Sequence, residues 1–276
     1  MSIRFRSQTP QGWHIDSRVE PFRFPGGEWH LRLPKNETPT AAIMHGADAD
    51  DLIVLSLWSD WAHSEGVEPT LFLPYLPAAR ADRGVPFGAK VYADIINAAG
   101  FAEVVVFDPH SPVAPTLIEN VRIVDSAPVI RNAIFGRSGF TGDYAAIIAP
   151  DKGAVERASR TADLLGLPLL TATKSRDFAT GKLTGFHAPE GVPESGRLLI
   201  VDDICDGGGT FMGLAEALNV GRERLSLWVS HGIFSGRANL LTEHFGAIYT
   251  TDSHPGARRE DVGAHVVSID SYLRVV

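Results

Sequence analysis

Carboxylates and glycines that could hold a phosphorylated sugar are concentrated at residues 198–218, in the string LLIVDDICDGGGTFMGLAEAL. A short apolar run, of the length of one buried strand, precedes Asp202 and Asp203. Asp206 and the segment 207–210 follow, and then come apolar residues at helical spacing. Glycine lets backbone N–H groups approach a ligand closely, and a helix N-terminus favours an anion. The pattern therefore predicts a strand–loop–helix unit for a ribose phosphate, with the acidic pair available to ribose hydroxyls or a divalent cation.

The composition is that of an ordinary globular chain. Its 276 residues, 44% hydrophobic and 21% charged, suffice for one large or two medium domains with a sizeable core. The formal net charge of −8, without a dense Lys/Arg run, argues against a nucleic-acid or anionic-membrane partner. No window approaches the roughly 18 apolar residues of a membrane span, and residues 1–13 lack a signal-peptide core. Phosphate binding must therefore come from local loops, metals and a few cations.

Cys205 is the only cysteine of the chain, so an intrachain disulfide is impossible and a cytoplasmic location is expected. Its neighbour Asp206 makes a catalytic thiol conceivable. The interpretation we favour is a small packing residue at the end of a strand.

Strand-like runs alternate with helical patterns from residue 70 onward. The runs are TLFLPYLP, EVVVFDPH, YAAIIAPD, LLIVDD, LSLWVSHG and GAIYTTDS, and helical spacing occurs at residues 91–99 and 155–165. Such alternation predicts parallel α/β layers. In such sheets ligands bind beyond the carboxyl ends of the strands, where the polar residues of these runs fall.

The first part of the chain has a different pattern. Alternating apolar residues between Pro and Gly predict short strands and hairpins, with another short strand at 40–45. Asp48, Asp50 and Asp51 could cap a following helix, but that segment is apolar almost all round, so a helix and a buried strand both remain open. The two halves of the chain look alike, which suggests a duplicated α/β domain with a linker in GRSGFTG, residues 136–142.

Six segments, in chain order, resemble one family. VDDICDGGGT resembles the phosphoribosyl-pyrophosphate (PRPP) binding motif that type I phosphoribosyltransferases share with PRPP synthetases. Five further segments resemble FxDGE, PYxxYARQDR, DLH, PDxGGxxRA and HGxFSG of PRPP synthetases; they are FPGGE at 24–28, LPYLPAARADR at 73–83, DPH at 108–110, PDKGAVERA at 150–158 and HGIFSG at 231–236. Ordinary phosphoribosyltransferases share only the first motif. The chain therefore resembles the ribose-phosphate pyrophosphokinase (PRPP synthetase) family over nearly its whole length.

The resemblance implies an α/β fold with two tandem phosphoribosyltransferase-like domains. Each would be a mostly parallel sheet flanked by helices, with short antiparallel strands at the N-terminus. Residues 1–138 would form the ATP side and the assembly surface, and residues 139–276 the ribose-phosphate side. The implied reaction is Mg²⁺-dependent transfer of pyrophosphate from ATP to the 1-hydroxyl of ribose 5-phosphate, which yields PRPP and AMP. A homo-oligomer, either a dimer or a hexamer, is also implied.

The resemblance also implies the site residues. Those expected to act in catalysis are Lys174, Arg176 and His110. Those expected to bind ATP are Glu28, Arg80 and Asp82. Those expected to bind the ribose phosphate are Asp202, Asp203, Asp206, Gly207, Gly208, Gly209 and Thr210. Those expected to hold Mg²⁺ are His110 and Asp151.

Two of these expectations compete with simpler interpretations. Lys174 and Arg176 resemble the Lys-x-Arg of a catalytic loop that closes over the site, although a Lys-Ser-Arg surface turn is common. Mg²⁺ prefers oxygen ligands, so Asp151 is the better metal ligand, and His110 could instead be a hydrogen-bonded residue at a loop edge.

Departures from the family pattern lie on the nucleotide side and on the loop that faces the sugar. Gly26 replaces the acid of FxDGE, Ala81 replaces the Gln of ARQDR, and Lys152 and Ala154 alter the PDxGG loop. A larger acceptor such as ADP-ribose, with Lys152 at an extra phosphate, is therefore an alternative. A non-catalytic regulatory subunit is another, but it would be expected to lack the metal and loop residues. An ordinary phosphoribosyltransferase would carry one such domain in a shorter chain.

Overall fold

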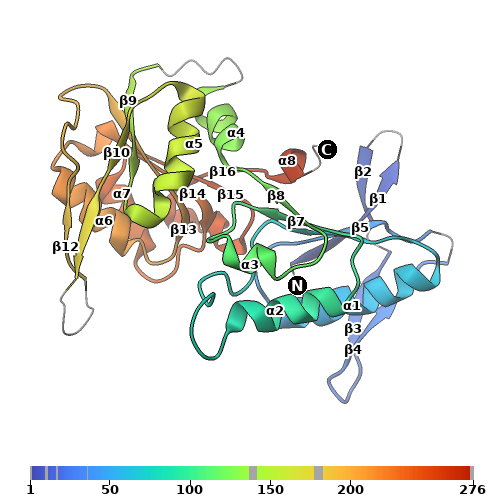
Figure 1. Cartoon of the computed structure of the whole chain (residues 1–276). Coiled ribbons are helices and arrows are strands. Elements are labelled where there is room, and N and C mark those ends of the chain that lie inside the picture. Colours follow the sequence, from blue (N-terminus) through green and yellow to red (C-terminus); the bar gives the residue numbers. More distant parts are fainter. Residues whose placement is uncertain are drawn as a thin grey trace. The chain divides into compact units, whose positions relative to one another are not determined.

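A computed structural model describes residues 2–9, 12–16, 18–35, 37–136, 142–176 and 183–273, leaving out the side chains of residues 8, 9, 12, 13, 175, 176, 183 and 184. Contacts divide the chain into two compact units (Figure 1). The first unit is Met1–Val124 together with Asp270–Val276, and the second is Asp125–Ile269.

The first unit contains a six-stranded sheet in the order β2-β1-β5-β6-β7-β8. Its strands are β1 (Ile3–Thr9), β2 (Gly12–Asp16), β5 (Ala41–Met44), β6 (Thr70–Leu73), β7 (Glu103–Phe107) and β8 (Val121–Val124). β1 pairs antiparallel with both β2 and β5, whereas β5 to β8 pair in parallel. A separate antiparallel hairpin is formed by β3 (Glu20–Arg23) and β4 (Trp29–Arg32). The helices of this unit are α1 (Ala49–Ser64), α2 (Gly88–Ala98), α3 (Val113–Thr116) and α8 (Asp270–Leu273).

The second unit contains a parallel sheet in the order β10-β9-β13-β14-β15-β16. Its strands are β9 (Tyr144–Ala149), β10 (Leu169–Thr171), β13 (Arg197–Cys205), β14 (Leu225–Gly232), β15 (Ala247–Thr251) and β16 (His265–Val267). A two-stranded antiparallel sheet is formed by β11 (Thr173–Arg176) and β12 (Leu183–His187). The α-helices are α4 (Ala127–Ile130), α5 (Val155–Leu165), α6 (Gly209–Leu218) and α7 (Leu241–His244).

The strands of the two sheets are arranged in a similar order. In each, the second strand lies outside the first at one edge, and the later strands are added on the other side in chain order. The strand order is shared, but the first two strands pair antiparallel in the first unit and parallel in the second. The expected α/β fold, with mostly parallel sheets and antiparallel N-terminal strands, is confirmed.

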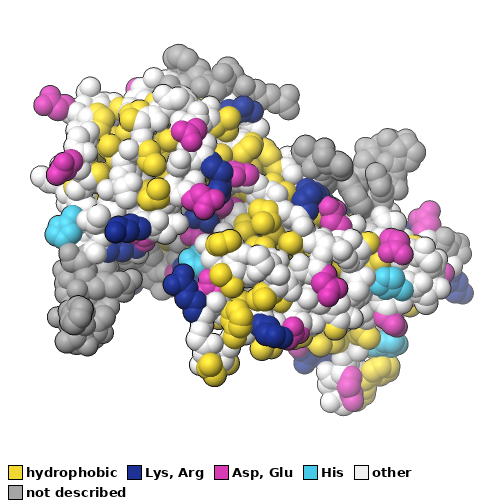
Figure 2. Space-filling view, in the orientation of Figure 1, with side chains coloured by type: hydrophobic (Ala, Val, Ile, Leu, Met, Phe, Trp, Pro, Cys, Tyr) yellow, Lys and Arg dark blue, Asp and Glu magenta, His cyan; other side chains and the backbone are white. Residues whose placement is uncertain are grey.

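Charged side chains of both signs share the surface. Figure 2 shows Lys and Arg interspersed with Asp and Glu on the face in view. Among the described residues, no helix combines the length and apolar character that crossing a bilayer would need. No broad basic patch is seen among the described residues on the face in Figure 2.

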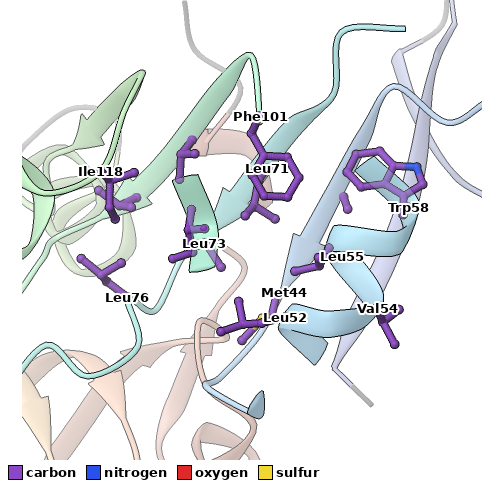
Figure 3. Packing of buried hydrophobic residues seen from close by; sticks show 14 of the residues in the cluster. Met44, Leu52, Val54, Leu55, Trp58, Leu71, Leu73, Leu76, Phe101 and Ile118 are labelled. Atoms are coloured by element: carbon purple, nitrogen blue, oxygen red, sulfur yellow. The ribbon is translucent and has the colours of Figure 1, made fainter. Parts of the chain in front are cut away.

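The ambiguous segment after residue 48 is a helix, α1. The Asp48 carboxylate accepts a hydrogen bond from the Asp50 backbone N–H at 3.0 Å, which satisfies one of the free donors at the helix start. Leu55 and Trp58 are buried in the core of the first unit, with Trp58 stacked on Phe101 (Figure 3). Burial of one face and the side-chain cap at Asp48 therefore explain why this segment is a helix and not a buried strand.

The structure extends two sequence expectations. The strand at the ribose-phosphate motif does not end at Val201 but continues as β13 through Asp202 and Asp203 to Cys205, so the acidic pair lies inside the strand. Cys205 is fully buried at the strand end, as its interpretation as a packing residue required. The strands β8, β10, β11, β12 and β16 were not anticipated, and Lys174, expected on a loop, lies on β11.

The change between the compact units lies earlier in the chain than residue 138. α4 packs against α5, and this contact brings the residues after Val124 into the second unit. Residues 137–141 of the expected linker lie outside the described residues. The assignment of residues 1–138 and 139–276 to an ATP side and a ribose-phosphate side stays a prediction.

The core of the first unit can be tested at α1. Trp58→Ala removes a side chain that is 0% exposed, so we expect the free energy of unfolding to fall by about 3–5 kcal/mol. Ile53→Ala, on the same helix but 49% exposed, is the matched control and should cost less than about 1 kcal/mol. Urea denaturation followed by circular dichroism measures both, and equal losses would contradict the placement of α1.

Candidate functional site

The second unit has its topological switch point at β9. From β9 the chain runs to β10 on one side of the sheet, and β13 pairs with β9 on the other side. Ligands of open parallel sheets bind outside the carboxyl ends of the strands at such a point. Asp151 follows the end of β9, and the segment 206–208 follows the end of β13. These two segments therefore lie where a ligand is expected.

Glycine is suited to each position of the loop between β13 and α6 for a different physical reason. Gly208 has φ +82°, in the left-handed region that favours glycine. A Cβ at Gly207 or Gly209 would meet no described atom within 4 Å, so both border open space. Gly208 precedes α6 and has no side chain with which to cap the helix. The backbone donors at the start of α6 are thus accessible to an anion such as a phosphate.

The segment after β14 supports this loop. The Cys205 carbonyl accepts hydrogen bonds from the backbone N–H groups of Ile233 at 2.9 Å and Phe234 at 3.1 Å. Ser235 donates its N–H to the Asp206 carbonyl at 3.1 Å and its hydroxyl to Asp206 Oδ1 at 2.5 Å. The exposed Asp206 carboxylate is therefore held in place. The HGIFSG motif signalled this segment, but its role as a support was not anticipated.

Arg157, on α5, lies between the two strand carboxylates. Its guanidinium nitrogens are 3.8 Å from Asp202 Oδ1 and 3.9 Å from Asp203 Oδ2. Arg157 and Asp203 are buried, whereas Asp202 is half-buried. Burial, and then the charge of Asp203, raise the pKa of Asp202 well above its ordinary value, although Arg157 opposes this. Of the two carboxyls, Asp202 is the more accessible to a sugar hydroxyl.

Lys174, on β11, joins two parts of the site. Its ammonium is 2.5 Å from Asp151 Oδ2 and 3.4 Å from the hydroxyl of Thr210, in the first turn of α6. The other oxygen of Asp151 accepts the backbone N–H groups of Gly153 at 2.8 Å and Ala154 at 3.3 Å. Burial raises the pKa of Asp151, but Lys174 and these N–H groups together lower it by more. The pKa of Asp151 therefore lies below the ordinary value of 3.8. A fixed cation thus stands beside the start of α6.

Lys152 and Ala154, the two residues of the loop after β9 that differ from the family pattern, have different surroundings. Ala154 is 1% exposed, so its methyl group belongs to the packed interior, where a glycine would leave a gap. Lys152 is exposed and could meet a ligand. Arg176 ends β11, but its side chain lies outside what the structure describes.

The expected ATP residues belong to the first unit. Asp82 is buried and accepts a hydrogen bond from the Ser111 hydroxyl at 2.6 Å, which ties the ARADR segment to the residue after His110. Arg80 and His110 are exposed, and Glu28 is exposed next to β4 in the β3–β4 hairpin. The structure therefore places Asp82 beside the DPH segment, where its carboxylate is hydrogen-bonded to Ser111.

Among the described residues, no group of three or more His, Cys, Asp or Glu side chains forms a ready metal cage. Mg²⁺ is commonly held by one or two carboxylates together with substrate phosphates, which does not require such a cage. The oxygens of Asp151 beside the open loop are compatible with that mode of binding. His110 and Asp151 belong to different units.

Known proteins match this chain over most of its length. Residues 129–230 match the phosphoribosyl transferase domain family. A ribose-phosphate pyrophosphokinase of Pyrococcus abyssi is 31% identical over 252 residues, which are 86% of this chain and 84% of the relative. One of Thermococcus kodakarensis is 30% identical over 228 residues, 79% of this chain and 78% of the relative. The crystal structure of phosphoribosylpyrophosphate synthetase from Mycobacterium smegmatis has a TM-score of 0.74 at 22% identity, covers 92% of this chain and 87% of that one, and shows the same fold.

The ion pair of Asp151 predicts a pH dependence. Because its pKa is lowered in the folded state, the pair stabilises the fold above the ordinary value of 3.8, and this contribution is lost as the pH falls. Carbon-13 NMR titration should give Asp151 a midpoint below 3.8. In Lys174→Met the midpoint should rise, since burial is then opposed only by backbone N–H groups. Lys90→Met, which removes a lysine paired with Asp94, is the control and should leave the midpoint unchanged; an unchanged midpoint in Lys174→Met would refute the pair.

Arg157 can be tested through stability. Arg157→Leu leaves Asp202 and Asp203 without this cation, so the free energy of unfolding should fall by about 3 kcal/mol. Arg160→Leu removes a neighbouring arginine that is 41% exposed and should cost about 1 kcal/mol or less. Urea denaturation at neutral pH separates the two, and a similar cost for both would mean that Arg157 does not compensate the carboxylates.

Proposed function

The chain belongs to the ribose-phosphate pyrophosphokinase family, and we propose that it transfers the pyrophosphoryl group of ATP to the 1-hydroxyl of ribose 5-phosphate, forming PRPP and AMP. The observation that carries this proposal is the open glycine loop at the start of α6, with the Lys174 ammonium 3.4 Å from Thr210 in the same turn. An anion cradle next to a fixed cation suits a sugar phosphate that must meet a triphosphate.

The acceptor side is built from β13 and α6. The backbone N–H groups of residues 207–210 would bind the 5-phosphate, because they belong to a helix start at which Gly207 and Gly209 border open space. The accessible Asp202 and the held Asp206 would orient the ribose hydroxyls, with Asp203 supporting from within the strand. In the reaction the 1-hydroxyl oxygen would attack the β-phosphorus, and the bond from that phosphorus to the α–β bridging oxygen would break. AMP would leave with that oxygen, and the hydroxyl proton would pass to water.

Charge on the phosphates would be stabilised by cations of the chain and by Mg²⁺. Lys174, and Arg176 two residues later, would approach the transferring phosphates, since positioned cations stabilise developing charge without reorganisation. Asp151 in the second unit and His110 in the first are each expected to bind Mg²⁺, which when bound would neutralise phosphate charge and orient the triphosphate. Glu28, Arg80 and Asp82 would form the ATP side. A homo-oligomer in the cytoplasm remains the expected form of the protein.

A larger acceptor is the second candidate. Lys152 is exposed and directly follows Asp151, so an acceptor with a further phosphate, such as ADP-ribose, could pair with it. The intact loop at residues 207–210 is needed by both acceptors and does not separate them.

The two acceptors are compared by supplying each with ATP and Mg²⁺ and following AMP and the pyrophosphorylated product. We expect ribose 5-phosphate to give the higher kcat/KM, and Lys152→Ala to leave it nearly unchanged. A preference for ADP-ribose that is lost in Lys152→Ala would favour the larger acceptor. Absence of turnover with both, under conditions that support a known enzyme of the family, would favour a regulatory subunit.

Lys174 is expected to act in the chemical step. Lys174→Ala should lower kcat by about 100-fold or more, because a charge aimed at the transition state is removed. Lys90→Ala, an exposed lysine of α2 that pairs with Asp94, is the control and should keep its activity. Near-normal turnover in Lys174→Ala would show that this part of the site is assigned wrongly.

A further inference from the structure

The hairpin that carries Lys174 has little backbone support of its own. β11 and β12 form a two-stranded antiparallel sheet, and in the described strands neither pairs with the six-stranded sheet beside it. An isolated two-stranded hairpin is marginally stable in water. Side-chain contacts must therefore determine where Lys174 lies relative to the ribose-phosphate loop.

Phe186 is the cross-strand partner of Lys174. The two residues are directly opposite in the β11–β12 register, and the Lys174 ammonium is 5.7 Å from the centroid of the Phe186 ring. Side chains of directly opposed residues lie on the same face of a hairpin. Whatever holds the Phe186 ring therefore also sets the path of the Lys174 side chain.

The Phe186 ring is seated on the backbone of α6 at Gly213. A Cβ at Gly213 would collide with Cε2 and Cδ2 of that ring. Glycine inside a helix costs about 1 kcal/mol relative to alanine, so close packing of the ring gives a physical reason for its presence here. β12 and α6 lie side by side in Figure 1.

Phe186 and Lys174 meet successive positions on one face of α6. Gly213 lies three residues after Thr210, and residues at this spacing share a helix face. Phe186 contacts Gly213, and the Lys174 ammonium reaches the Thr210 hydroxyl at 3.4 Å. The hairpin is thus aligned along α6 from its first turn onward.

We propose that Phe186 is a positioning residue, which by its seat on Gly213 holds the β11–β12 hairpin against α6 and so places the Lys174 ammonium at the ribose-phosphate loop. The role assigned to Lys174 rests on the proposed function. The seat itself is a structural feature and can be tested independently of it.

The experiment uses the full chain with two single variants that remove the seat in opposite ways. Phe186→Ala removes the ring, and Gly213→Ala displaces it with one methyl group. Each should lower kcat for PRPP formation by about 10- to 100-fold, since a displacement of about 1 Å can have that effect, while the KM of each substrate changes less than about twofold. Glu216→Ala, on the exposed side of α6, is the control and should behave as wild type.

A readout without activity accompanies the kinetics. Amide hydrogen exchange at residues 183–187 and 173–176 should become faster in both variants, while exchange in β13 and α6 stays at the wild-type rate. A merely structural role of the Phe186–Gly213 contact would instead accelerate exchange across the whole unit and lower the free energy of unfolding.

Direct contact is tested by a double variant. Phe186→Leu combined with Gly213→Ala replaces the ring with a smaller side chain while adding a methyl group, so its kcat should exceed the value expected from Phe186→Leu and Gly213→Ala measured singly. Wild-type kcat and exchange in Gly213→Ala would overturn the proposal. If the wild-type protein forms no PRPP, the proposed function fails, and the exchange measurements still decide whether Phe186 holds the hairpin.

Discussion

The parallel pairing of β9 with β13 is the constraint on which the candidate site of the second unit depends. It is formed in register at Ile148 and Ile200, both fully buried, so that the two strands end at the same edge of the sheet. Asp151 and the loop after β13 project from that edge. β10 pairs with β9 on the side away from β13, so the strand order reverses between β9 and β13. At that point the carboxyl edge of the sheet is open, and β11 places Lys174 there beside Asp151.

Charge in this part of the site is balanced by few groups. Asp202 and Asp203 share Arg157 inside the unit, whereas Asp151 pairs with Lys174 nearer the surface. The two environments have opposite effects, since burial and a like charge raise the pKa of Asp202, and Lys174 keeps that of Asp151 low. Under the proposed function, a negatively charged substrate would depend on the backbone donors of α6 and on Lys174, in a chain whose overall charge is −8.

The glycines in and near α6 are needed for different structural reasons. Gly208 is required by its positive φ, and Gly207 and Gly209 leave space beside the backbone. Gly213 is required by the ring of Phe186, which is far from it in the chain. The first three belong to a local motif and can be interpreted from neighbouring residues. The fourth has no local signal, because its partner comes from another element.

The sequence by itself determined the α/β class, the main strands, the helices α2, α5 and α6, and the family, because these depend on local periodicity and on ordered motifs. The assignment of the Asp202–Thr210 segment and of Lys174 to the site comes from the same motifs and stays a prediction. Only the tertiary structure decided that α1 is a helix, that Arg157 lies between Asp202 and Asp203, and that Lys174 pairs with Asp151. Those features join residues that are distant in sequence, and their contacts arise only when the strands have paired and the helices have packed on them.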